Sequence, residues 1–224
     1  MGMGRTGQHS EVSPAAAERA ALCDLFAEVG ESAPTLCAGW DAGDLLTHLL
    51  IRETRPDAFA GVLIPPLGGY TARVQQALRD SQPFGALVEK LRSGPPVWSP
   101  LGLPVVRDRA NLHEFFIHHE DVRRARPGWS VRDLPQETRD GLWRIVRLMA
   151  PLLVRGVKDT RITLQTPDGG ERALGRKDAP NDVTVTGEPG EILLYLSGRR
   201  AFAEVKITGS PAGQARLAAA KLGL

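Results

Sequence analysis

The densest group of side chains that can do chemistry lies between Asn111 and Asp121, in the stretch NLHEFFIHHED. It contains three of the five histidines and three acidic residues. If this stretch is helical, Glu114 and His118 stand one turn apart on the same face, where they can bind one metal ion together. One helix then supplies two donors, whereas a site of three protein ligands with an open position needs a third from elsewhere.

The third donor is sought among the histidines outside this stretch, His9 and His48. His9 lies close to the N-terminus, where chains commonly fray. His48 belongs to GWDAGDLLTHLL, in which Asp41 is predicted to cap a helix and Asp44 to occupy its positive first turn. For a lone histidine the simpler interpretation is a half-buried side chain with a local hydrogen bond. The second cluster of donors favours His48 as a ligand instead.

The elements that must position these residues follow from hydrophobic periodicity. Before Gly156 it predicts four long helices and two short ones. The long helices are expected at about 14–29, from Asp41 onward, at about 107–126 and at 134–154, and the short ones at about 70–79 and 84–92. After Gly156, β-rich runs at 161–165, 183–186 and 204–208 alternate with helices at 189–197 and 211–222. The sequence therefore predicts an α + α/β protein, with a four-helix bundle over residues 1–156 and a small mixed α/β domain over 157–224.

Composition narrows the class of protein. The chain has 224 residues, 42% hydrophobic and 24% charged, as is ordinary for a globular protein. Its net charge of +2 is too small to indicate a nucleic-acid surface. The sequence lacks a run of roughly 20 apolar residues, and its start has no apolar signal-peptide core. We expect a cytoplasmic protein without nucleic-acid or membrane partners.

The two cysteines, Cys23 and Cys37, form neither a CxxC pair nor a disulfide framework. Cys23 lies in a helical pattern and is predicted to be a small buried apolar side chain. Cys37 precedes a Gly-Trp turn, where it could be a fourth metal ligand, a reactive thiol or a structural residue. The structural role is the simplest of the three.

Three stretches of the chain carry a family resemblance. They are TLCAGWDAGDLLTHLL, NLHEFFIHHEDVRRA and, in the C-terminal part, DVTVTGEPGEILLYLSGR. With these motifs the chain resembles the mycothiol-dependent maleylpyruvate isomerase family, whose N-terminal metal-binding bundle is related to DinB-like proteins. Matched position by position, the metal ligands of the family fall on His48, Glu114 and His118, the residues that spacing had already selected.

The resemblance implies a divalent metal, usually zinc, together with a small-molecule substrate and a low-molecular-weight thiol, mycothiol. The expected activity is a thiol-dependent isomerase or S-transferase acting on a small electrophile. Asp121 is predicted to accept the second NH of a metal-bound imidazole, with an ion pair to Arg123 or Arg124 as the alternative. Arg199 and Arg200 could bind a substrate carboxylate, or be solvated surface residues.

Other interpretations stay open at this point. His113 and His119 point a helical step away from the Glu114 face and are predicted to pack or to support the ligands. The sequence assigns no catalytic residue. A non-catalytic metal-containing or lipid-binding module, similar to a sterol carrier, is the alternative from another class, and a water-activating hydrolase is a third possibility. No serine or cysteine triad signature favours another hydrolytic mechanism.

Overall fold

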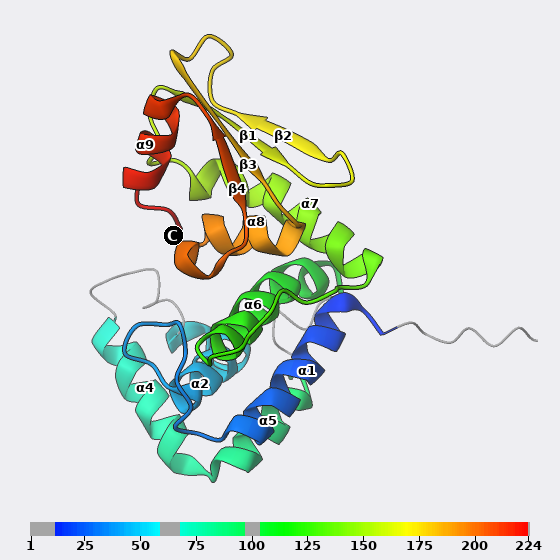
Figure 1. The fold of residues 1–224 in the computed structure, drawn as a ribbon. Coiled ribbons are helices and arrows are strands. Elements are labelled where there is room, and N and C mark those ends of the chain that lie inside the picture. Colours follow the sequence, from blue (N-terminus) through cyan, green and yellow to red (C-terminus); the bar gives the residue numbers. More distant parts are fainter. Residues whose placement is uncertain (1–11, 59–67, 97–103, 224) are drawn as a thin grey trace, which may run out of the picture.

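The computed structural model of the chain describes residues 12–58, 68–96 and 104–223, with side chains from Asn111 onward in the last range. His9 lies outside the described residues. The N-terminal part is helical (Figure 1). Its helices are α1 (Pro14–Val29), α2 (Ala42–Thr54), α4 (Gly68–Ser81), α5 (Phe84–Arg92), α6 (Pro104–Arg124) and α7 (Gln136–Leu153). The predicted helices are confirmed, with ends that differ by a few residues.

Local sequence explains where α1 and α2 begin. The Ser13 hydroxyl accepts from the Ala16 NH at 3.4 Å, and proline occupies the first turn of α1. At α2, Asp41 accepts from the Asp44 NH at 2.9 Å while the Asp44 carboxylate accepts from the Asp41 NH at 3.3 Å. This reciprocal capping box satisfies two backbone donors and fixes the start of the helix that carries the predicted third ligand.

The C-terminal part contains a four-stranded mixed sheet in the order β2-β1-β3-β4. Its strands are β1 (Thr160–Gln165), β2 (Glu171–Leu174), β3 (Asn181–Thr186) and β4 (Lys206–Gly209). The central strands β1 and β3 are parallel, and each outer strand is antiparallel to its neighbour. Helices α8 (Pro189–Leu196) and α9 (Pro211–Ala219) and the short 3₁₀ helix η3 (Arg200–Phe202) complete it. The predicted fold class is confirmed. Strand β2 is an addition, because a short and mostly polar edge strand gives little sequence signal.

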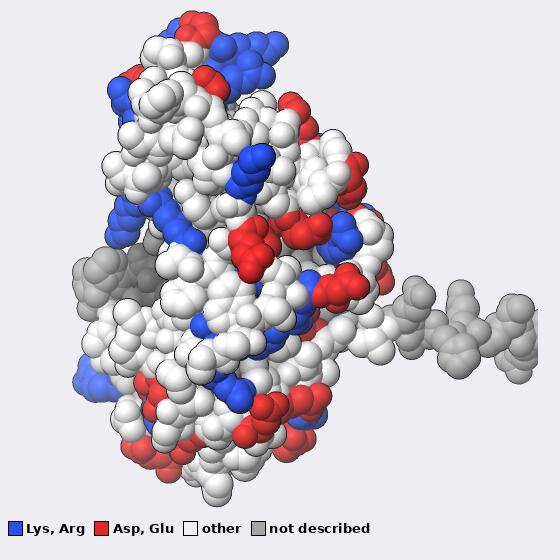
Figure 2. Space-filling view, in the orientation of Figure 1, with Lys and Arg blue, Asp and Glu red and all other residues white. Residues whose placement is uncertain are grey.

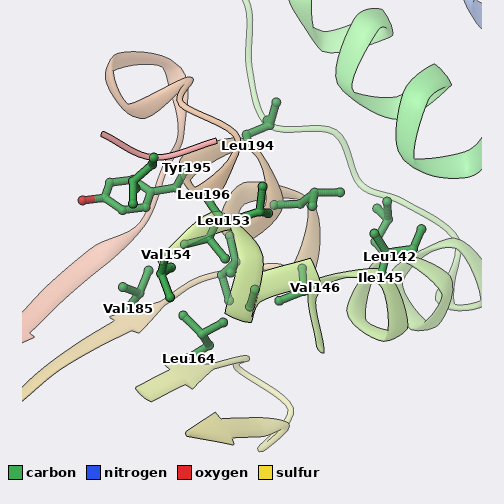
Figure 3. Close-up of a cluster of buried hydrophobic side chains, with 14 of the residues drawn as sticks. Leu142, Ile145, Val146, Leu153, Val154, Leu164, Val185, Leu194, Tyr195 and Leu196 are labelled. Atoms are coloured by element: carbon green, nitrogen blue, oxygen red, sulfur yellow. The ribbon is translucent and has the colours of Figure 1, made fainter. Parts of the chain in front are cut away.

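One buried apolar cluster joins α7 to α8 and to one face of the sheet (Figure 3). Alternate residues of β1 and β3 point into it, as a half-buried strand requires. The members drawn are Leu142, Ile145, Val146, Leu153, Val154, Leu164, Val185, Leu194, Tyr195 and Leu196, among others. A second cluster fills the space between α1, α2, α5 and α6. The predicted domain boundary at Gly156 thus separates α7 from residues that share its core, and independent folding of the two parts stays a prediction.

Helix α8 lies between the sheet and α6 (Figure 1). The approach is close at Gly190, where an added Cβ would stand 2.5 Å from the Phe116 ring. Glycine there lets the start of α8 contact α6 directly. On the molecular face in Figure 2, acidic and basic residues are intermixed without a continuous field of one sign, in keeping with the net charge of +2.

Candidate metal centre

Helix α2 holds His48 against α6. The residues around it, Leu45 and Leu49, are buried in the apolar cluster of the helical part, so packing sets the depth of the imidazole. His48 itself is 9% exposed. Its ring centroid lies 5.2 Å from that of Trp40 and 5.4 Å from that of His118. The histidine from α2 therefore meets the polar face of α6.

Glu114 and His118 lie one turn apart on that face of α6. The His118 Nε2 atom is 3.4 Å from Glu114 Oε2. One donor atom from each of His48, Glu114 and His118 lies within 4.8 Å of the other two. The structure thus brings together the three residues selected from the sequence. Their binding of a metal ion stays a prediction.

Asp121 holds the other nitrogen of the His118 ring. His118 Nδ1 is 2.9 Å from Asp121 Oδ2, and the Asp121 side chain is fully buried. An ionised carboxylate only accepts hydrogen bonds, so Nδ1 carries the hydrogen and Nε2 faces Glu114. Arg123 and Arg124, the alternative partners, instead pair with Glu120 at 2.9 and 2.5 Å.

Arg199 reaches Asp121 from the segment that follows α8. Its Nε and Nη2 donate to the two carboxylate oxygens at 2.9 and 2.8 Å, and its Nη1 donates to the Ser197 carbonyl at 2.8 Å. Cys37 also lies here, with Sγ 3.2 Å from Asp121 Oδ2 and 3.7 Å from Arg199 Nη2. Cys37, His118 and Asp121 form a second group of possible metal donors. A pocket of about 290 Å³ opens beside Cys37 and Arg199.

The charges of the site are set by burial and by these contacts. Burial, together with the neighbouring His118, lowers the pKa of His48 to about 4, so His48 is neutral and keeps a lone pair. Burial opposes the charged form of His118, but hydrogen bonds to Asp121, Cys37 and Glu114 outweigh it and hold the pKa of His118 well above its ordinary value. For Glu114 and Asp121, burial acts against ionisation, but hydrogen bonds outweigh it. The pKa of Glu114 is lowered well below its usual range, and the pKa of Asp121 is lowered to about 2.

A further polar pair adjoins Glu114. The Arg52 side chain, one turn after His48 on α2, is 6% exposed, and its Nε lies 3.8 Å from Glu114 Oε2. Its Nη1 donates to Asn111 Oδ1 at 2.8 Å. On the other side of Glu114, His113 Nδ1 is 3.6 Å from Oε1. His113 was predicted to point a helical step away from this face, and its side chain nevertheless lies beside the carboxylate.

Two other predicted residues have contacts of a structural kind. Arg200 donates to the backbone carbonyls of Leu217, Ala218 and Ala220, which end α9. These bonds favour a capping role over the predicted substrate contact. His119 Nδ1 lies 3.0 Å from Glu18 Oε2 on α1, so His119 joins two helices instead of supporting the ligands.

Arg52 and Asn111 were not assigned to the site from the sequence, and a metal-ligand role for Cys37 was only one of three alternatives. Asn111 lies three residues before Glu114, so helical spacing places it on the same face and could have included it. Arg52 follows His48 by one turn of α2, so the same spacing could have included it as well. Cys37 lies 84 residues before Asp121, and nothing in the local pattern could connect the two.

The donor set fits a divalent ion. Two imidazole nitrogens and one carboxylate oxygen are a ligand combination found in catalytic zinc sites. His48 is neutral, Glu114 is ionised, and Asp121 fixes the ring of His118 with Nε2 toward the other donors. In the metal-free protein the raised pKa of His118 means that a proton competes with the ion for Nε2.

Comparison with known proteins supports the fold. No family model matches the chain, and no curated protein does. Among solved structures, the crystal structure of the mycothiol-dependent maleylpyruvate isomerase is similar, with a TM-score of 0.54 and 16% sequence identity. The match covers 87% of this chain and 90% of that one. At this identity the likeness establishes a shared fold.

None of the described helices is long and apolar enough to cross a membrane.

Proposed function

We propose that the protein is a divalent-metal-dependent enzyme that uses mycothiol to isomerise, or to transfer sulfur to, a small electrophilic substrate. The observation that supports this most directly is the convergence of His48, Glu114 and His118, with donor atoms within 4.8 Å of one another. It occurs in a fold shared with a mycothiol-dependent isomerase over most of both chains. Two histidines and one carboxylate are a ligand set of catalytic zinc sites, and zinc is the ion that we propose.

In this proposal His48, Glu114 and His118 hold the ion. A bound zinc ion lowers the pKa of a thiol or water and polarises a carbonyl group. The chain itself does the positioning. Asp121 keeps His118 in one tautomer and orientation, and Arg199 holds Asp121 in place with two hydrogen bonds. The pocket of Cys37 and Arg199 borders the two residues that contact Asp121, and it offers room for the thiol.

The test is the zinc-induced rise in melting temperature of wild type and Glu114→Gln, with metal content measured by elemental analysis. A ligand that binds only the folded state at 100 times its dissociation constant stabilises it by about 2.7 kcal/mol. Glu114→Gln keeps the shape but removes the negative charge, so the zinc-induced shift should fall sharply. Because the shift is a difference, any effect of the substitution on the metal-free protein cancels.

The matched control is Glu89→Gln, the same change on the exposed surface of α5, where Glu89 pairs with Arg92. It should leave the zinc-induced shift unaltered. Equal shifts in wild type and Glu114→Gln contradict the ligand assignment. Turnover of maleylpyruvate with and without mycothiol then tests the thiol dependence separately.

A further inference from the structure

Asn111 begins the polar stripe of α6, which continues with Glu114, His118 and Asp121. Its side-chain NH₂ group has no hydrogen-bond acceptor among the described residues. The residue is 1% exposed, and its Nδ2 atom is buried with no hydrogen-bond partner in the described part of the chain. A buried donor left unpaired costs on the order of 1–3 kcal/mol. Buried polar groups in native proteins are nearly always paired, so each exception calls for a specific explanation.

The orientation of the Asn111 amide follows from its neighbour Arg52. A guanidinium group has donors only, so the Asn111 atom that lies 2.8 Å from Arg52 Nη1 must be the oxygen. The NH₂ group then points away from Arg52. A flipped amide would set two donors against each other, so the oxygen is the atom that faces Arg52.

The unpaired donor belongs to the same face as the proposed metal ligands. Asn111 and Glu114 are three residues apart on α6, and such residues are neighbours on a helix surface. Arg52 joins them from α2, since it contacts Asn111 Oδ1 and its Nε lies 3.8 Å from Glu114 Oε2. A cation and an oriented amide donor thus stand beside the proposed metal site, at the end of the stripe opposite to Asp121 and Arg199.

We infer that the Asn111 amide donates a hydrogen bond to a substrate oxygen that becomes negatively charged during the reaction. The substrate class is a small electrophile in which a carbon-carbon double bond is conjugated to a carbonyl group. This inference rests on the proposed function. Arg52 is then a positioning residue, which keeps the NH₂ group of Asn111 directed away from itself.

The proposed isomerisation explains why a hydrogen-bond donor at the substrate oxygen would be useful. The thiolate sulfur forms a bond to the β-carbon of the substrate, and the π electron pair moves to the carbonyl oxygen as an enolate. Rotation occurs about the former double bond. The enolate then collapses, the carbon-carbon double bond re-forms in the other geometry, and the thiolate leaves. No oxidant or reductant is required, and a fixed donor at the oxygen stabilises charge that exists only during the reaction.

The test uses Asn111→Leu, of similar size, and Asn111→Ala, which is smaller. Both are neutral and have no side-chain donor, and the second serves if the first does not fold. The probe is oxalate, a small planar dianion whose charged oxygens stand in for the enolate oxygen. Its binding to the zinc-loaded protein is measured by calorimetry, and kcat and KM are measured for maleylpyruvate with mycothiol. Asn181→Asp, at the half-buried start of β3, is the control substitution.

The expected result is oxalate binding at least tenfold weaker in the Asn111 variants, with zinc content unchanged. Loss of one such donor lowers kcat by roughly 10²- to 10³-fold, and KM should change much less. Variants that bind oxalate and turn over like wild type overturn the role of Asn111 while leaving the proposed function intact. A wild-type protein without zinc binding or thiol-dependent turnover contradicts the proposed function itself, and with it this inference.

Discussion

Replacing Arg199 by glutamine separates two roles for this arginine. From the sequence, Arg199 could be a substrate-binding residue or a solvated surface residue. In the structure its Nε and Nη2 donate to Asp121 and its Nη1 donates to the Ser197 carbonyl. If the arginine mainly holds Asp121, its removal should destabilise the protein before any substrate is added. If it mainly binds substrate, stability should hardly change and KM should rise.

The expected size follows from burial. Removing one partner of a buried ion pair costs about 3–5 kcal/mol. Asp121 is fully buried, but Arg199 is 24% exposed and the carboxylate keeps its bond to His118, so we expect a smaller cost, about 2 kcal/mol. For a chain of this length, 1 kcal/mol corresponds to about 2–4 °C in melting temperature, which gives a decrease of roughly 4–8 °C.

The assay is thermal unfolding of the metal-free protein, followed by circular dichroism. Arg126→Gln is the matched control, because Arg126 forms an ion pair with Glu28 in which both side chains are largely exposed. Such a pair contributes at most about 1 kcal/mol. Arg199→Lys should lie between wild type and Arg199→Gln, since it keeps the charge but loses the two-pronged contact.

A melting temperature of Arg199→Gln within about 1 °C of wild type refutes the reasoning, given the 2–4 °C expected per kcal/mol. A rise in KM without a loss of stability would then assign Arg199 to the substrate. A double-mutant cycle with Asp121→Asn adds a direct measurement, because residues in contact couple by about 0.5–3 kcal/mol. Purely additive effects would show that the pair contributes nothing of its own.

Three further outcomes are expected. Asp121→Asn should weaken zinc binding about 10- to 100-fold, because His118 loses its carboxylate partner; competition with a chelator measures this, and an unchanged affinity contradicts it. Glu18 is buried, but hydrogen bonds from its histidine and arginine partners outweigh burial and lower its pKa. A lowered folded-state pKa contributes stability above the unfolded-state value and loses it as pH falls. The stability difference between wild type and Glu18→Gln should therefore shrink as pH falls below about 4.3, and urea unfolding at several pH values shows whether it does. Gly190→Ala should destabilise by about 1–3 kcal/mol because its Cβ would stand 2.5 Å from the Phe116 ring, and a melting temperature equal to that of wild type would mean that the ring can move aside.

Local spacing was sufficient to predict the helices and the geometry of the proposed ligands along α6. Glu114 and His118 share a face because residues four apart always do in a helix. Likewise Asp41 and Asp44 form a capping box over three residues, a distance that the sequence displays directly. These predictions depend on the backbone of one element alone, and they hold whatever the rest of the chain does.

The contacts that complete the site could not be predicted in this way. Arg199 meets Asp121 across 78 residues, and Arg52 meets Asn111 across 59. Such pairs depend on how separate elements pack, which helical periodicity does not encode. The other side of α6 also departs from the simple pattern, because Glu120 is charged and yet as deeply buried as the apolar residues beside it. A pattern that equates polar with exposed therefore misreads buried residues such as Glu120 and Asp121.

Those buried charges fix α8 to α6 at both ends. At its first turn, Glu191 pairs with Arg124 at 2.5 Å and also accepts from the Glu204 NH at 2.8 Å. Just after its last turn, Arg199 pairs with Asp121. Asp121 and Arg124 are three residues apart on α6, so one turn of that helix carries both attachments. Because Asp121 also holds the His118 ring, a displacement of α8 would move the carboxylate that orients a proposed metal ligand. The position of the C-terminal part and the geometry of the proposed metal centre are therefore mechanically linked.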